Sequence, residues 1–77
     1  MPAAPPPTWV LARRRALGDR IREERNARQL SQEKLAELAG MDRQAINRIE
    51  QGHQSPIVDN LFRIARALDV PLADLVR

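Results

Sequence analysis

Residues 31–52 read SQEKLAELAGMDRQAINRIEQG, and this stretch decides how the chain folds. Ser31 can cap a helix over residues 32–39, and Glu33 suits the positive end of that helix. Gly40 then ends the helix, because glycine readily takes the left-handed conformation that closes a helix C-terminus. The first half of the stretch therefore predicts a short helix followed by a tight turn.

The second half of the stretch predicts another short helix, over residues 43–51. Asp42 is a good N-cap, and Gly52 ends the helix. At ~100° per residue the apolar residues share one side and the hydrogen-bonding residues share the other. The apolar set is Ala45, Ile46 and Ile49, and the polar set is Arg43, Gln44, Asn47, Arg48 and Gln51. Arginine can bond guanine, and glutamine or asparagine can bond adenine, within a major groove that admits an α-helix. We therefore expect the polar face to read DNA bases, with an ordinary solvated helix as the alternative.

The two short helices are expected to pack against each other across the Gly40 turn. The apolar side of the first helix comprises Leu35, Ala36, Leu38 and Ala39. Ala36 is small enough to let the second helix come close, which is the geometry of a helix-turn-helix unit. In such a unit the first helix crosses the DNA backbone and the second enters the groove. Ser31 and Gln32, at the start of the first helix, are therefore expected to contact phosphate.

The flanking sequence predicts further helices and no strand. An early helix begins at about residue 11 or 17, since Gly18 leaves its start open, and it ends near residue 28. Ser55 and Pro56 supply the cap and the first-turn proline of a helix over residues 56–68. The buried stripe of that helix comprises Ile57, Leu61, Ile64, Ala65 and Leu68. A last helical turn or two runs to the C-terminus. We therefore predict an all-α fold, a compact five-helix domain over residues 11–77.

The N-terminal segment differs from the rest of the chain. Residues 1–7 hold four prolines and show no periodicity, and residues 1–10 are expected to form a disordered Pro-rich extension, although Thr8 can cap a helix. Trp9 is expected to pack at the edge of the core, with contact to a partner as the alternative. Residues 13–15 are three arginines that could reach the DNA backbone or minor groove, although we favour a solubilising stretch of helix.

Composition narrows the class of protein. The 77 residues suggest one small domain, and the chain has no cysteine and a single histidine, so we expect neither a disulfide nor a metal site, and no cofactor. The sequence has no run long and apolar enough for a membrane span. It also offers no pairing of a nucleophile with a catalytic base, which argues against an enzyme. Lys34 is the only lysine, so twelve of the thirteen basic residues are arginine, the side chain best suited to bidentate phosphate and base contacts.

Several runs of residues together resemble a known family. They are LSQEKLA at 30–36, GMDR at 40–43, INRIEQG at 46–52, SP at 55–56 and LDVPLADL at 68–75. In this order and spacing they resemble the Cro/repressor helix-turn-helix family, also called XRE-type, over about residues 17–75. The resemblance implies a phage-repressor-like domain of five helices that binds operator DNA, usually as a two-fold dimer. A pseudo-palindromic operator with half-sites about one helical turn apart would follow from that symmetry.

The resemblance also implies roles for individual residues. Base reading falls to Arg43, Gln44 and Arg48, with Asn47 as a lesser candidate. Gln32 resembles the family's phosphate-contacting glutamine. His53 and Gln54, in the loop that follows, could meet phosphate through backbone amides. Asp42 departs from the serine or threonine that is common there, and although it caps well it would repel phosphate.

Arg25 is expected to have a structural role. Leu17, Ile21 and Arg25 step by four along the early helix, so Arg25 continues a buried stripe and needs a partner for its charge. Glu50 ends the helix over residues 43–51 near its core side. The resemblance implies an ion pair between Arg25 and Glu50.

The expected function is that of a sequence-specific DNA-binding transcriptional regulator, either a repressor or a small controller protein. Leu72, Leu75 and Val76 are more apolar than a chain end that faces water usually is, so we expect a homodimer interface there. The alternative is an antitoxin-like protein-binding module with secondary DNA binding, whose Pro-rich extension engages a protein partner. With either function the protein is expected to be cytoplasmic, and as a regulator it is expected to be nucleoid-associated.

Overall fold

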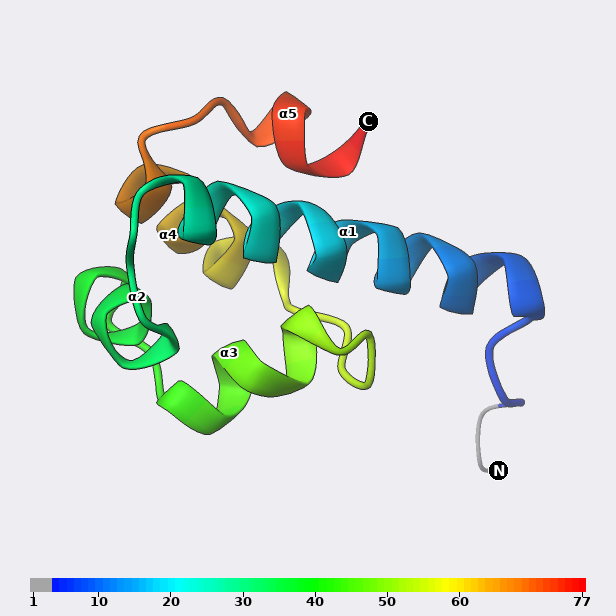
Figure 1. Ribbon diagram of the computed structural model, residues 1–77. Helices are drawn as coiled ribbons and strands as arrows, with labels where there is room; N and C mark the ends of the chain where they lie inside the picture. The colour runs from blue at the N-terminus through cyan, green and yellow to red at the C-terminus, as the bar shows by residue number, and fades with distance from the viewer. Residues whose placement is uncertain (1–3) are drawn as a thin grey trace.

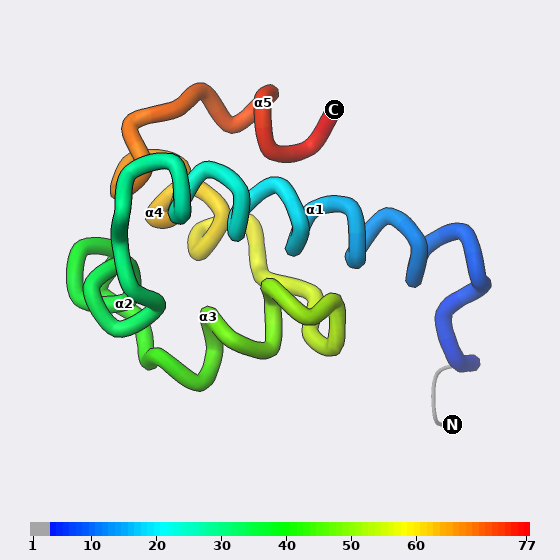
Figure 2. The backbone as a smooth tube through the Cα atoms, in the orientation of Figure 1, coloured from blue at the N-terminus to red at the C-terminus, as the bar shows by residue number. Residues whose placement is uncertain are grey.

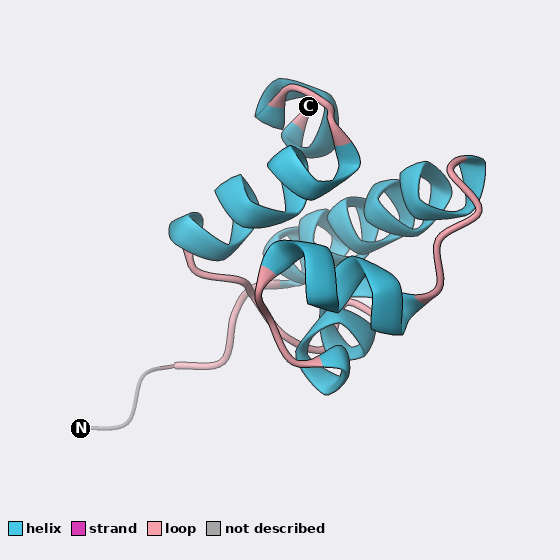
Figure 3. Cartoon of the chain, turned by 90° about the vertical axis from the view of Figure 1, so that its left-hand side faces the viewer, coloured by secondary structure: helices cyan, strands magenta, loops and turns pink. Residues whose placement is uncertain are grey.

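The computed structural model describes residues 4–77 and shows five helices joined by short loops (Figures 1 and 2). The helices are α1 (Thr8–Ala27), α2 (Gln32–Ala39), α3 (Arg43–Glu50), α4 (Val58–Leu68) and α5 (Leu72–Val76). Figure 3 shows them from the side of α2, and no strand occurs among the described residues. The expected all-α fold of five helices is confirmed.

The first helix begins earlier than either predicted start. Pro7 takes the N-cap position, and its carbonyl oxygen accepts hydrogen bonds from the amides of Val10 at 3.0 Å and Leu11 at 3.2 Å. Thr8 is therefore the first helical residue and not the cap. Residues 8–10, which we had assigned to the extension, are helical, and the expected disorder at residues 1–3 lies outside the described residues. The start of α1 projects past the other helices in Figure 1, and Trp9 is 68% exposed, so the expected packing of Trp9 on the core does not occur.

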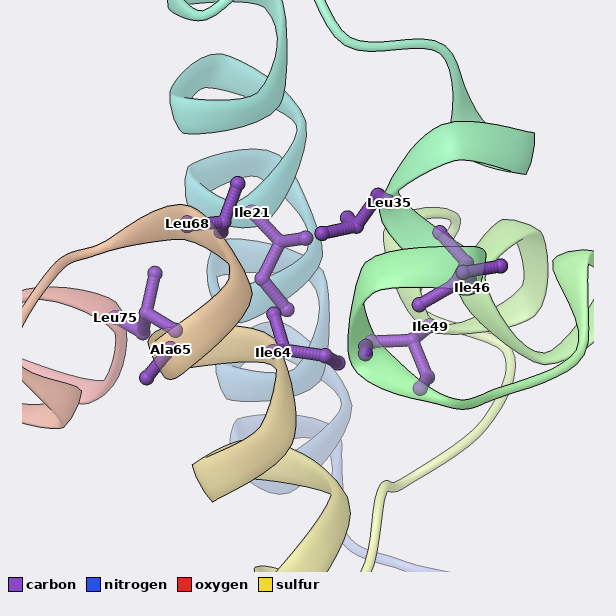
Figure 4. Packing of buried hydrophobic residues seen from close by; sticks show 10 residues of the cluster. Ile21, Leu35, Ile46, Ile49, Ile64, Ala65, Leu68 and Leu75 are labelled. Carbon is purple, nitrogen blue, oxygen red and sulfur yellow. The ribbon is translucent and has the colours of Figure 1, made fainter.

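One apolar core holds the five helices together. Its buried members are Ile21, Leu35, Ala36, Ala39, Ile46, Ile49, Ile64, Ala65, Leu68 and Leu75. Figure 4 shows Ile21, Leu35, Ile49 and Ile64 converging from α1, α2, α3 and α4. Burial of each leucine or isoleucine side chain stabilises the fold by about 1.5–3 kcal/mol. The core thus fixes α3 against both α1 and α2.

The turn between α2 and α3 follows the sequence closely. The Ser31 hydroxyl oxygen accepts a hydrogen bond from the Lys34 amide at 2.9 Å, which caps α2. Gly40 has φ 67° and ψ 38°, a left-handed conformation that favours glycine, and the Met41 amide donates to the Ala36 carbonyl at 2.9 Å. Asp42 has the backbone of an N-cap, but its side chain makes no capping hydrogen bond. Asp42 therefore occupies the predicted N-cap position, although its carboxylate does not bond to the amides of α3.

The later helices differ from the prediction at their starts and in one buried residue. α4 begins at Val58, two residues after the predicted start at Pro56, and Ile57 occupies the N-cap position. Ile57 is 65% exposed and does not belong to the buried stripe. Leu75, which we had expected at a dimer interface, is fully buried in the core of its own chain. The reason is that α5 folds back over α1 and α4, so Leu75 has no surface left for a partner.

Candidate nucleic-acid interface

The third helix presents one apolar face and one polar face. Ile46 and Ile49 are buried in the core. The exposed side chains of α3 and its cap are Arg43, Gln44, Arg48 and Gln51, and Ala45 and Asn47 are part-buried. α3 lies along the lower edge of the molecule in Figure 1, with the other helices on one side of it. The polar face of α3 is therefore open to a ligand as large as a nucleic acid.

The second helix packs across the inner side of α3. Leu35, Ala36 and Ala39 are buried, and α2 contacts both α3 and α4. Leu38, which we had placed on the apolar side, is half exposed instead. The small Ala36 is buried and lines one pocket together with Ala45 of α3. α2 and α3 thus form a rigid unit with the start of α2 beside the polar face of α3.

A buried ion pair ties the end of α3 to α1. The Arg25 Nε donates to Glu50 Oε2 at 2.7 Å, and Arg25 Nη2 donates to Oε1 at 2.9 Å, so the pair is bidentate. The side chains of Arg25 and Glu50 are only 12% and 2% exposed. Arg25 Nη1 also donates to the Leu30 carbonyl at 2.8 Å. The hydrogen bond to Glu50 raises the pKa of Arg25 against the opposing effect of burial. The structure therefore brings together the two residues that the family resemblance implied as a pair.

Gln32 extends this pair into a network that joins α1, α2 and α3. Its Nε2 atom donates to Glu50 Oε1 and to Asn47 Oδ1, both at 3.2 Å. The side-chain Nε2 atom of Gln51 donates to the same Asn47 oxygen at 3.4 Å. Asn47 therefore has its acceptor oxygen engaged inside the protein, and an adenine contact through both ends of its amide would first have to break these bonds. The network favours a positioning role for Asn47.

The loop after α3 offers phosphate fewer groups than expected. The His53 amide donates to the Arg48 carbonyl at 2.9 Å, so it cannot also bind a phosphate as we had expected. The His53 side chain is exposed, and Gln54 is part-buried. At the start of α2, by contrast, the Ser31 hydroxyl accepts the capping bond and keeps its own hydrogen to donate.

Gly18 is a residue whose role sequence reasoning missed. A Cβ atom at Gly18 would lie 2.4 Å from the carbonyl oxygen of Ile49 and 2.6 Å from that of Glu50. Glycine therefore lets the backbone of α1 touch the end of α3. The only signal in the sequence is a lone glycine inside a helix, which we had taken as a sign that the helix starts late.

An apolar surface on α4 was also missed. Ile57, Val58 and Phe62 are each more than half exposed. Val58 and Phe62 lie one turn apart on the same flank of α4 as Ala65, and Figure 4 shows Ala65 beside Leu75 of α5. The sequence did indicate this surface, because Val58 and Phe62 are apolar, lie four residues apart and are not part of the predicted buried stripe.

The model of the family described as Helix-turn-helix matches residues 21–75. This chain belongs to the helix-turn-helix family. Membership makes the chain a DNA-binding transcriptional regulator, and the Cro/repressor-type resemblance expected from the sequence is confirmed. The family and the fold are those of transcriptional regulators.

Similar sequences and a similar solved structure also belong to transcriptional regulators and control proteins. An uncharacterized HTH-type transcriptional regulator of Methanothermobacter thermautotrophicus is 50% identical over 48 residues, which cover 62% of this chain and 70% of the relative. The control protein C.SmaI of Serratia marcescens is 33% identical over 60 residues, or 78% of this chain and 71% of that protein. The crystal structure of the restriction-modification controller protein C.AhdI from Aeromonas hydrophila is similar with a TM-score of 0.82 and 39% identity, and the match covers 83% of this chain and 97% of that one.

None of the helices in residues 4–77 combines the length and the apolar character that a membrane crossing requires.

Proposed function

We propose that this helix-turn-helix protein reads a specific DNA site by inserting α3 into the major groove. The observation that carries the proposal is the division of α3, whose isoleucines are buried while its arginine and glutamine side chains face outward. An α-helix fits the major groove, and these side chains match the hydrogen-bonding edges of guanine and adenine. A buried network behind α3 supports the proposal, because base reading needs a helix held in one orientation.

Arg43, Gln44 and Arg48 are the proposed base-reading residues. All three are exposed, and none of their side chains makes a hydrogen bond within residues 4–77. They can therefore bind base edges without losing an internal bond. Asn47 is proposed to hold Gln32 in place and to reach a base only as a lesser contributor, since its oxygen already accepts from Gln32 and Gln51.

Phosphate contacts are proposed on both sides of α3. At the start of α2, Ser31 can donate its hydroxyl, and the first amides of the helix have no partner inside it. Gln32 would contact phosphate through its backbone amide, because both hydrogens of its Nε2 atom are donated to Glu50 and Asn47. On the other side, the His53 side chain takes the role that we had given to its backbone amide, and the Gln54 backbone amide keeps the phosphate contact expected from the sequence. Phosphate contacts fix the orientation of the protein on the duplex and carry little sequence information.

We further propose a two-fold homodimer through α4 and α5. Of the three residues predicted at the interface, Leu72 and Val76 keep exposed surface. We add the exposed side chains of Ile57, Val58 and Phe62 to the proposed interface. Large apolar side chains that gather on one surface usually mark a contact with another protein. A dimer would read a pseudo-palindromic operator with half-sites about one helical turn apart. A DNA target also supports the cytoplasmic, nucleoid-associated location expected from the sequence.

Site selection from random DNA tests the reading face. The bound sequences should share a half-site repeated with two-fold symmetry. On the selected site, Arg43→Ala and Arg48→Ala should each lose about 1–3 kcal/mol of binding, roughly 5- to 150-fold in Kd, and relax the preference at one position. Arg66→Ala, which removes a charge from the exposed last turn of α4, is the matched control and should bind like the wild type. Equal losses on the selected site and on random DNA would refute base reading by α3.

Sedimentation tests the dimer separately. Phe62→Glu and Val76→Glu place a charge in the proposed interface and should shift the mass toward the monomer. Leu38→Glu is the matched control, because Leu38 is also a half-exposed apolar residue but lies on α2. A wild type that stays monomeric at high concentration, or a Leu38→Glu variant that dissociates as readily as the others, would contradict this interface.

The projecting start of α1 supports a second function, the binding of a protein partner. Trp9 and Leu11 are both exposed there, beside the Pro-rich segment. Deletion of residues 1–7 should then abolish partner binding and leave operator binding intact. Loss of operator binding in the same deletion would argue against a separate role for the segment.

A further inference from the structure

The loop after α3 has no strongly basic side chain of its own. Residues 51–57 read QGHQSPI, and no arginine or lysine occurs between Arg48 and Arg63. Arginine and lysine supply most of the binding energy that proteins gain from DNA phosphates. This loop lies at the end of the proposed reading helix, where the DNA backbone that borders the groove would pass. A cation at this place must therefore come from another part of the chain.

The first helix brings Arg15 to this loop. A Cβ atom at Gly52 would lie 3.1 Å from the Cα atom of Arg15 and 3.4 Å from its Cβ atom. One turn further along α1, Gly18 lies against the carbonyl oxygens of Ile49 and Glu50. Two close backbone contacts therefore fix this part of α1 on the end of α3. The position of Arg15 relative to the reading helix is set by packed backbone and not by a flexible tail.

Arg15 differs from its neighbours in being free to bind a ligand. Five other arginines in α1 and at its C-cap have partners: Arg13 donates to the Val76 carbonyl, Arg20 to the Leu75 and Arg77 carbonyls, Arg22 pairs with Asp19, Arg25 with Glu50 and Arg28 with Glu24. The Nε atom of Arg14 is buried without a hydrogen-bond partner. Arg14 is part-buried in a pocket that Leu17 and Leu75 also line. Arg15 is exposed and makes neither a hydrogen bond nor an ion pair within residues 4–77. Residues 4–7, which precede α1, also turn toward the side of the molecule on which α3 lies (Figure 1).

We propose that Arg15 binds a backbone phosphate of the DNA that flanks the base pairs read by α3. The inference rests on the proposed function and extends the DNA-contacting surface from the helix-turn-helix onto α1. Arg15 carries a full positive charge to a loop that otherwise offers only His53 and polar side chains. As a phosphate contact it adds affinity on every sequence and does not change which bases are preferred.

The test compares the salt dependence of binding for Arg15→Gln, Arg66→Gln and the wild type. Two duplexes are used, one with the selected site and natural flanks and one trimmed to the base pairs of the half-sites. On the long duplex, loss of one phosphate contact should make the slope of log K against log salt shallower by about 0.9 in Arg15→Gln for each protomer bound. That slope change corresponds to a ~3.5-fold difference in affinity between 50 and 200 mM salt. Arg66→Gln should keep the wild-type slope, and on the trimmed duplex all three proteins should have the same slope.

Three results would overturn a phosphate contact by Arg15. The first is an unchanged slope for Arg15→Gln on the long duplex. The second is a slope change that persists on the trimmed duplex or appears in Arg66→Gln. The third is a thermal midpoint of Arg15→Gln below that of Arg66→Gln, which would assign Arg15 to the stability of α3. Failure of the proposed function looks different, because the wild type itself would then bind the selected site no better than random DNA.

Discussion

Replacement of the buried Arg25–Glu50 pair tests how the reading helix is anchored. Arg25→Met leaves the Glu50 carboxylate, which is 2% exposed, with Gln32 as its remaining partner at 3.2 Å. A buried charge that loses its partner costs about 3–5 kcal/mol, and the bond from Gln32 puts the expected loss near the lower end, at about 3 kcal/mol. Glu50→Leu should cost less, about 2 kcal/mol, because Arg25 keeps the Leu30 carbonyl and is 12% exposed.

The double variant Arg25→Met with Glu50→Leu should be more stable than either single variant. It removes both charges and leaves apolar side chains in their place, an exchange that is often neutral. We expect it to lie within about 1 kcal/mol of the wild type, so the two substitutions should couple by about 4 kcal/mol or more. For a domain of this size, the Arg25→Met loss corresponds to a drop of roughly 12–24 °C in the thermal midpoint.

Urea denaturation followed by far-ultraviolet circular dichroism is the assay, since it reports all five helices. Fluorescence would be a poor choice, because the only tryptophan is exposed at the projecting end of α1. Single variants that each lose less than about 1 kcal/mol, with an additive double variant, would refute the reasoning. They would show that the pair behaves as a solvent-exposed ion pair does.

Three further changes test local features. Gly18→Ala should destabilise the protein by about 1–3 kcal/mol although alanine favours helix, since the new Cβ would lie 2.4 Å from the Ile49 carbonyl oxygen; wild-type stability in urea would contradict this close approach. Ser31→Ala should cost about 1 kcal/mol through loss of the bond to the Lys34 amide, and an unchanged thermal midpoint would contradict a capping role. Asp42→Asn should tighten DNA binding more at low salt than at high salt, because it removes a negative charge from the proposed interface; equal affinities at low salt would contradict that placement.

Features that depend on residues adjacent in the chain could be predicted before the fold was known. Ser31 as a cap, Gly40 in the left-handed conformation and the two faces of α3 all follow from local backbone preferences and from the helical repeat. These features were enough to locate the proposed reading face and to support the family resemblance. The pairing of Arg25 with Glu50 came from that resemblance, because no local pattern links residues so far apart.

Only the tertiary structure decided the features that depend on what packs against a residue. Leu75 is buried because α5 folds back over α1, whereas Ile57 has the same apolar character and stays exposed at the start of α4. Gly18 lies inside α1 although glycine disfavours helix. Glycine is required there because the end of α3 leaves no room for a Cβ atom. Asn47 carries the chemistry of a base reader, yet its oxygen is engaged by Gln32. In each case the residue type is known from the sequence, but its contribution to the free energy of folding or binding depends on the neighbour that the fold brings to it.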